Sequence, residues 1–261
     1  MEVIIQSNAQ SAVNLVSRIV ADALLAKPNL VLGLATGKTM EAVYKELVRI
    51  YQHGAIDFSQ CHTFNLDEYV GLSPDDKHSY HFYMNNYLFG HINIKPGNTH
   101  LLDGTALHLQ AECEQYEKTI KKVGGIDLQL LGIGNDGHIG FNEPLSALRS
   151  KTRSKALTPE TLSQNAQLFE DKSAMPHRAL TMGVGTILES KRCIMLATGK
   201  AKANIIAQAI EGPITSMISA SALQLHPHCT VVVDENSGSR LQQTDYYRWI
   251  FNNEPEWEAY R

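Results

Sequence analysis

The sequence has few cysteines, no long apolar run and no cluster of a single charge. Its four cysteines are scattered without CxxC spacing, and three lie in apolar runs where a small buried side chain is expected. This pattern favours neither disulfide bonds nor a cysteine-based metal site. No apolar run reaches the roughly 18 residues that suggest a membrane span, so we expect no membrane-embedded segment.

The first residues and the charge balance argue against export and against nucleic-acid binding. The opening segment, MEVIIQSNAQ, lacks the basic start and apolar stretch of a signal peptide, so we expect a soluble, cytoplasmic protein. The chain has 23 basic and 27 acidic residues, a net charge of −4, and no run rich in Lys or Arg. Nucleic-acid binding depends on such basic patches and is not expected, whereas a small anionic ligand fits this composition.

The histidines do not form a metal-binding pattern. Neither the pair His78 and His81 nor the pair His226 and His228 has the i,i+4 helical spacing and nearby carboxylate of a zinc helix. We therefore predict no metal and no other cofactor.

Helical and strand-like segments alternate along the chain. Val13, Val16 and Val20 recur as on one face of a helix, and the apolar run 30–32 follows them. Further helices are expected near residues 43–50, 113–123 and 202–210, and further strands at 63–66, 127–131, 193–197 and 230–233. This alternation predicts a doubly wound α/β fold, with a mostly parallel, Rossmann-like sheet covered by helices on both faces. No linker or repeat divides residues 1–261, so we expect a single domain.

Four polar clusters each follow directly on a predicted strand. They are ATGKT after residues 31–34, LDEY after the strand at 63, GIGNDGH after 128–131 and ATGKAK after 194–196. Ligands of open α/β sheets bind outside the carboxyl ends of the strands. Each cluster alone is ordinary loop chemistry, but together they predict a site at one edge of the sheet.

The first cluster resembles a nucleotide-binding loop but lacks its spacing. A Walker A loop reads GxxxxGK[ST], and the segment from Gly33 to Thr39 is one residue short of it. A second fingerprint, GIGNDG, fits GxGxxG but comes late in the chain and carries an Asp where a pyrophosphate would approach. A turn that enters a helix still presents N–H groups to an anion. We therefore predict an anion site at Thr36, Gly37, Lys38 and Thr39, with a plain strand-to-helix turn as the alternative.

The segment GNDGHIGFNEP contains the chemically richest group, Asp136, His138 and Glu143. A histidine flanked by two carboxylates can be held in one orientation and kept basic, which suits a general acid or base. The alternative is a surface loop with hydrogen-bonded charges. Asp67 and Glu68 are adjacent and would point to opposite sides of a continuing strand, so we expect only one of them, Asp67, to face the site.

At these motifs the chain resembles a known family. FNLDEYVGL, GIGNDGHIGFNEP, ALTMGVGTIL and the ATGK-type loop are similar to those of the glucosamine-6-phosphate deaminases, over residues 3–235. The resemblance implies an isomerising deaminase that converts glucosamine 6-phosphate and water to fructose 6-phosphate and ammonia without a redox cofactor. It also implies a doubly wound α/β sheet, in agreement with the alternation of segments.

The resemblance implies a role for each matching residue. Asp67 would move a proton between C2 and C1 of the open-chain sugar, and His138 would open the pyranose ring, oriented by Asp136 and Glu143. The 6-phosphate would be held by residues 36–39 together with Lys202, and residues 158–177 would form a mobile lid.

Two departures from the family pattern concern the phosphate. Lys38 stands in a loop that usually reads TGGTP, and Gln167 stands where the lid usually has an arginine. We hypothesise that Lys38 partly replaces that arginine, although a flexible ammonium does not reproduce a bidentate guanidinium. A different amino-sugar phosphate, such as galactosamine 6-phosphate, stays an alternative substrate.

Ser146, Arg153 and Lys155 resemble a site where some family members bind the activator N-acetylglucosamine 6-phosphate between subunits of a hexamer. A solvated basic stretch is the alternative. We expect a homo-oligomer, with both a hexamer and a monomer left open. The divergent tail, residues 236–261, could dock on its own core or on a neighbouring subunit.

Two other functions compete with the deaminase. A 6-phosphogluconolactonase would share the fold and the phosphate loop, but the combined LDEY and NDGHIGFNEP motifs favour the deaminase. A sugar-phosphate sensing module of a transcription regulator would need a DNA-binding domain, for which the first expected strand and helix leave no space.

Overall fold

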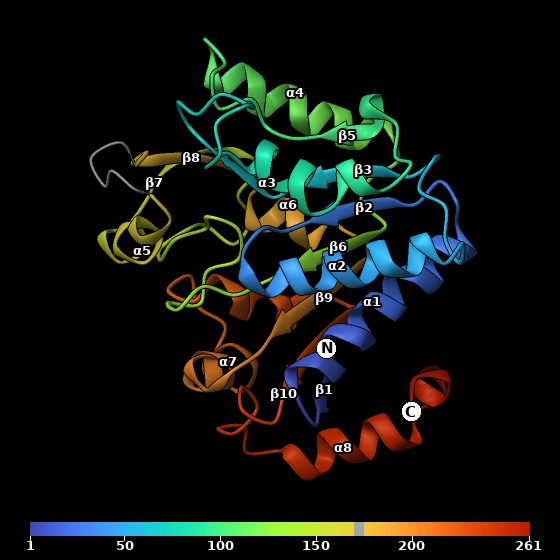
Figure 1. Ribbon diagram of the computed structural model, residues 1–261. Coiled ribbons are helices and arrows are strands. Elements are labelled where there is room, and N and C mark those ends of the chain that lie inside the picture. The colour runs from blue at the N-terminus through green and yellow to red at the C-terminus, as the bar shows by residue number, and fades with distance from the viewer. Residues whose placement is uncertain (170–174) are drawn as a thin grey trace.

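The computed structural model describes residues 1–169 and 175–261 and contains a seven-stranded parallel sheet (Figure 1). In spatial order its strands are β1 (Glu2–Gln6), β10 (Cys229–Asp234), β9 (Arg192–Ala197), β6 (Leu128–Leu131), β2 (Val31–Leu34), β3 (His62–Asn65) and β5 (Thr99–His100). From β2 the chain builds outward to β3 and β5, and from β6 it builds in the other direction to β9 and β10. The strand order therefore reverses between β2 and β6, where such sheets bind ligands.

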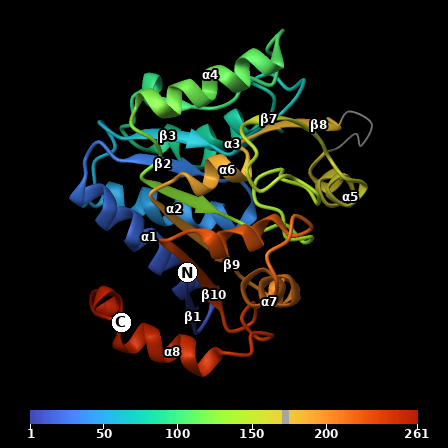
Figure 2. The same cartoon turned by 180° about the vertical axis from the view of Figure 1, so that it is seen from behind.

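Helices cover both faces of this sheet, as the sequence predicts. Helices α1 (Ala9–Ala26) and α2 (Lys38–Gln52) lie together on the face toward the viewer in Figure 1. Helix α6 (Val184–Leu188) and the 3-10 helix η6 (Ser219–Leu225) lie on the opposite face, seen in Figure 2. Strands β2, β6 and β10 are buried along their whole length, because both faces are covered.

Two further helices, α4 (Leu109–Lys122) and α7 (Ala203–Glu211), lie beside the sheet. Helix α4 lies beyond the β5 edge, and α7 follows β9 through the short 3-10 helix η5 (Lys200–Lys202). Each of the helices and strands predicted from periodicity is present, with ends shifted by a few residues. No helix in the described ranges is both long and apolar enough to cross a membrane.

A second, antiparallel sheet was not predicted. Its strands are β4 (Asp67–Tyr69), β8 (Arg178–Thr181) and β7 (Arg153–Ala156), in that order. Helices α3 (Tyr80–Tyr87) and α5 (Pro159–Asn165) accompany it, and η3 (Ala166–Leu168) follows α5. A small core separate from the main one includes Tyr69, Phe141 and Phe169. Since β4 begins two residues after β3 ends, this sheet stands next to the carboxyl ends of the main strands.

The predicted lid, residues 158–177, includes α5 and η3. Residues 170–174 of that segment lie outside the described residues. The mobility of the lid therefore stays a prediction.

The C-terminal tail docks on its own chain. Helix α8 (Thr244–Asn253) packs along β1, and the 3-10 helix η7 (Pro255–Tyr260) follows it (Figure 1). Trp257 is fully buried between the rings of Phe251 and Tyr260, with the Arg192 guanidinium 5.6 Å from its ring centre. The tail thus covers the edge strand of the sheet instead of extending away from it.

Candidate active site

The four polar clusters lie at one edge of the sheet. They follow β2, β3, β6 and β9, which are neighbours in the sheet and run parallel. The two clusters after β2 and β6 flank the point where the strand order reverses. The fold therefore brings together the loops that the sequence singled out.

The turn after β2 leads directly into α2. Gly37 has φ +110°, a conformation that favours glycine, and Lys38 is the first residue of the helix. The carbonyl of Gly37 accepts hydrogen bonds from the N–H groups of Met40 and Glu41, and these bonds form the first turn of the helix. The free end of the helix and its dipole are suited to an anion.

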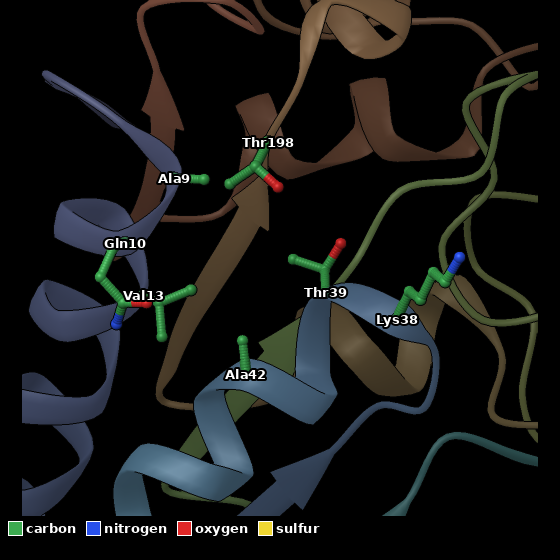
Figure 3. A pocket seen from close by; sticks show the side chains of 7 residues that line it. All are labelled: Ala9, Gln10, Val13, Lys38, Thr39, Ala42 and Thr198. Carbon is green, nitrogen blue, oxygen red and sulfur yellow. The ribbon is translucent and has the colours of Figure 1, made fainter.

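A cavity of about 380 Å³ adjoins this turn and is shown in Figure 3. The hydroxyls of Thr39 and Thr198 face each other across it, whereas the exposed Lys38 side chain extends away from the other labelled residues. Lys38 is one of the residues that line this cavity, and its side chain is exposed.

His138 lies between two carboxylates. Its Nδ1 is 2.7 Å from Asp136 Oδ1 and 3.5 Å from Glu143 Oε2. Burial opposes a charge on the ring, but the interactions with Asp136 and Glu143 outweigh it and raise the pKa of His138 to about 9. The imidazole is thus protonated at neutral pH. A Cβ at Gly134 would lie 2.5 Å from the ring, so only glycine leaves room for it.

Asp67 is buried at the start of β4. Burial and the charge of Glu68 raise the pKa of Asp67 to about 7, while the charge of His138 and the backbone N–H of Phe141 oppose this rise. Glu68 points elsewhere: its carboxylate accepts the N–H groups of Tyr80 and His81 at 3.0 Å and lies 2.9 Å from His81 Nδ1. Of the two adjacent acids, Asp67 is the one associated with the His138 loop.

Lys202 connects the loop after β9 to the loop after β6. Its ammonium donates to the carbonyl of Ile133 at 2.8 Å and to Asn135 Oδ1 at 2.7 Å. Burial lowers its pKa, and the charge of Asp136 opposes that change. The structure therefore places a partly buried cation beside the His138 loop.

Asp136, His138 and Glu143 are also the one group in the described ranges that could offer three ligand atoms to a metal, all within 4.8 Å of one another. Both carboxylates, however, lie against the same imidazole nitrogen. That arrangement suits a shared proton, since a metal would have to displace it. The absence of a metal stays a prediction.

The predicted lid position and the three predicted regulatory residues have fewer contacts with the site. Gln167 lies in η3 and is exposed. Ser146 is buried, and its hydroxyl has no partner among the described residues. Arg153 donates to Asn142 Oδ1 at 2.9 Å, and Lys155 lies two residues further along β7. Arg153 thus contacts the residue before Glu143, but among the described residues no hydrogen bond or ion pair joins Ser146, Arg153 and Lys155 to one another.

The sequence did not reveal every contact in the site. Thr158 donates its N–H and its hydroxyl to the Glu143 carboxylate, at 3.1 and 3.2 Å. The segment Thr158-Pro159 signals a helix start, but nothing local identifies a partner 15 residues away. The hydroxyls of Tyr44 in α2 and Tyr83 in α3 also donate to backbone carbonyls of the turn after β2, and no sequence pattern predicted these contacts.

Comparison with known proteins shows the family of this chain. Residues 5–232 match the family described as glucosamine-6-phosphate isomerases/6-phosphogluconolactonase. The chain belongs to this family.

Several relatives are similar over nearly their full length. A glucosamine-6-phosphate deaminase of Thermoanaerobacter pseudethanolicus is 46% identical over 94% of this chain and 97% of its own, and one of Arthrobacter sp. is 45% identical over 99% and 100%. The solved structure of a monomeric glucosamine-6-phosphate deaminase has a TM-score of 0.90 at 44% identity, covering 92% of this chain and 100% of that one. A 6-phosphogluconolactonase of Trypanosoma cruzi has a TM-score of 0.74 at 18% identity, which shows the fold alone.

Proposed function

We propose that the protein is a glucosamine-6-phosphate deaminase that converts glucosamine 6-phosphate and water to fructose 6-phosphate and ammonia. The observation that carries this proposal is the meeting of a buried carboxyl group, Asp67, with a protonated imidazole, His138, at one edge of the sheet. Deaminases that are 44–46% identical over nearly the whole chain support the choice of substrate.

His138 serves the first step, the opening of the pyranose ring. With a pKa of about 9 it is protonated at neutral pH and can donate a proton to the ring oxygen as the C1–O5 bond breaks, while the hydroxyl proton of O1 passes to water. Asp136 and Glu143 stabilise the charged imidazole and fix its orientation. The product of this step is the open-chain aldehyde.

Asp67 serves the second step, the movement of a proton from C2 to C1. Its pKa of about 7 makes it a stronger base than an ordinary aspartate while leaving it largely ionised at mildly alkaline pH. As this proton moves from C2 to C1, one amine proton passes to O1, so the aldehyde becomes an alcohol and the amine at C2 becomes an imine. Water then hydrolyses the imine to release ammonia and the ketose. The reaction is redox-neutral overall, so it requires no redox cofactor.

The 6-phosphate is proposed to bind at residues 36–39, at the start of α2, with Lys202 as a cation. The exposed Lys38 supplies a second cation where Gln167 cannot. Because a lysine binds as a flexible point charge, it fixes the substrate less firmly than an arginine would.

The cellular location and the assembly remain proposals as well. A cytoplasmic enzyme fits a phosphorylated substrate, which does not cross membranes freely. The solved relative is described as monomeric, whereas Ser146, Arg153 and Lys155 would bind an activator only if a regulated oligomer forms. Size-exclusion chromatography with and without N-acetylglucosamine 6-phosphate distinguishes these states.

The decisive experiment is an assay of ammonia and fructose 6-phosphate with glucosamine 6-phosphate as substrate. Equimolar formation of both products is expected, and Asp67→Asn should abolish it. Galactosamine 6-phosphate tests the alternative amino sugar. Hydrolysis of 6-phosphogluconolactone without release of ammonia would replace the proposal by a lactonase. Binding of the sugar phosphate without any turnover would replace it by a sensing module.

A further inference from the structure

Three tyrosine hydroxyls bind three consecutive residues of the turn after β2. Tyr44, in α2, donates to the carbonyl of Ala35. Burial raises the pKa of Tyr80, in α3, and a contact of its hydroxyl with the side chain of Thr36 opposes that rise. Tyr83, one helical turn further along α3, donates to the carbonyl of Gly37 at 2.8 Å. Two helices thus hold a turn of three residues from one side.

These hydrogen bonds determine which way the peptide groups point. A peptide unit is planar and trans, so its C=O and the following N–H point in opposite directions. With the carbonyl of Ala35 turned toward Tyr44, the N–H of Thr36 points away from that tyrosine. With the carbonyl of Gly37 turned toward Tyr83 and the first turn of α2, the N–H of Lys38 points out of the helix end. Carbonyl oxygens would repel an anion, and here they are turned away from it.

The three phenols are firmly placed and stay protonated. The ring of Tyr83 packs edge-on against Tyr44 and against Tyr80, each at 6.4 Å between centroids, and against Tyr87 at 4.6 Å. Burial raises the pKa of Tyr44, Tyr80 and Tyr83 well above that of an ordinary tyrosine. Since Tyr44 and Tyr83 stay protonated, each keeps its proton for a carbonyl of the turn.

We infer that Tyr44, Tyr80 and Tyr83 are positioning residues that hold the turn after β2 with its N–H groups directed at the substrate phosphate. The inference rests on the proposed function, because it takes this turn as the phosphate site. The tyrosines act through the backbone of residues 35–38.

Tyr83→Phe is the sharpest test, because it removes one hydroxyl and keeps the ring. The dissociation constant of inorganic phosphate, measured by titration calorimetry, should rise roughly 3- to 10-fold, as expected for the loss of one neutral hydrogen bond. KM for glucosamine 6-phosphate should rise by the same factor with kcat nearly unchanged, since the phosphate is bound equally in the ground state and the transition state. Tyr80→Phe should give a similar change through Thr36.

Tyr87→Phe is the matched control. The ring of Tyr87 packs against that of Tyr83 in the same helix, tilted by 44°, but among the described residues no hydrogen bond joins its hydroxyl to the turn. Its phosphate affinity and KM should equal those of the wild type. A loss of thermal stability in Tyr83→Phe with unchanged phosphate affinity and unchanged KM would overturn the inference, because the hydroxyl would then be merely structural.

The two proposals fail in different ways. If the wild type releases no ammonia but still binds phosphate in a manner that depends on Tyr83, the reaction is wrong and the positioning role stands. If the wild type binds neither inorganic phosphate nor glucosamine 6-phosphate, the positioning role is wrong. If it releases ammonia and Tyr83→Phe matches Tyr87→Phe in every binding measurement, only the positioning role falls.

Discussion

The raised pKa of Asp67 has a consequence for stability as well as for activity. Burial and the charge of Glu68 raise this pKa to about 7, from 3.8 in an ordinary aspartate. Between these two pH values the unfolded chain releases a proton that the folded protein keeps, so rising pH favours the unfolded state. At about 1.36 kcal/mol for each pH unit, the cost to folding reaches roughly 4 kcal/mol above pH 7.

Asp67→Asn should remove this cost, because an amide ionises in neither state. The advantage of the variant in free energy of unfolding should grow by about 2 to 3 kcal/mol between pH 5 and pH 7 and stay level above pH 7. At about 2–4 °C per kcal/mol for a chain of this size, the Tm difference should widen by several degrees. Urea unfolding or calorimetry at pH 5, 6, 7 and 8 measures it. The variant should be inactive throughout.

Asp234→Asn provides a control of opposite sign. Burial alone would raise the pKa of Asp234, but hydrogen bonds from Ser237 and the N–H of Gly199 lower it below 3.8. Its charge therefore stabilises the folded protein above that pH, and the variant should be less stable than the wild type at pH 7. A difference between Asp67→Asn and the wild type that stays constant from pH 5 to 8 would refute the reasoning, because Asp67 would then be ionised over the whole range.

Three further predictions concern activity and folding. The value of kcat/KM should rise as pH increases through about 7, where Asp67 ionises, and fall above about 9, where His138 loses its proton; a profile that is flat from pH 6 to 8 would contradict this assignment. Lys38→Gly should raise KM for glucosamine 6-phosphate with little effect on kcat, and an unchanged KM would remove Lys38 from phosphate binding. Trp257→Ala should destabilise the protein by about 3–5 kcal/mol in urea unfolding, because a fully buried ring is lost, and should leave kcat intact; a stability equal to that of the wild type would show that the tail does not hold β1.

The part of the fold that could be predicted is the part with a strong repeating pattern. Helix α1 carries apolar residues on one face over 18 residues, and β9 and β10 are uninterrupted buried runs, so periodicity identifies them. The sheet of β4, β8 and β7 could not be found in this way. Strand β4 has three residues, two of them acids, and its place depends on pairing with β8, about 110 residues away. Such pairing is a tertiary effect that local preference does not encode.

The part of the candidate site that depends on the order of the strands was predictable from the sequence. Parallel strands end at a common edge, which explains why Asp67 and His138 could be expected near one another from the sequence alone. The contacts of long side chains were not predictable. Lys202 reaches Asn135, and Tyr83 reaches Gly37, across gaps set by the packing of helices. Separation in the sequence, 67 and 46 residues in these two bonds, gives no signal for them.

The charges of the site explain why both groups can act over the same pH range. In water an aspartate and a histidine are both charged only between about pH 4 and 6.5. Here both pKa values are shifted upward: burial and the charge of Glu68 raise the pKa of Asp67, and the interactions with Asp136 and Glu143 raise that of His138 against the effect of burial. The range in which the base is ionised and the acid is protonated therefore lies between about 7 and 9. The two limits are coupled, because the charge of His138 lowers the pKa of Asp67. Loss of Asp136 or Glu143 would therefore lower the upper limit and, wherever His138 becomes neutral, would also raise the pKa of Asp67.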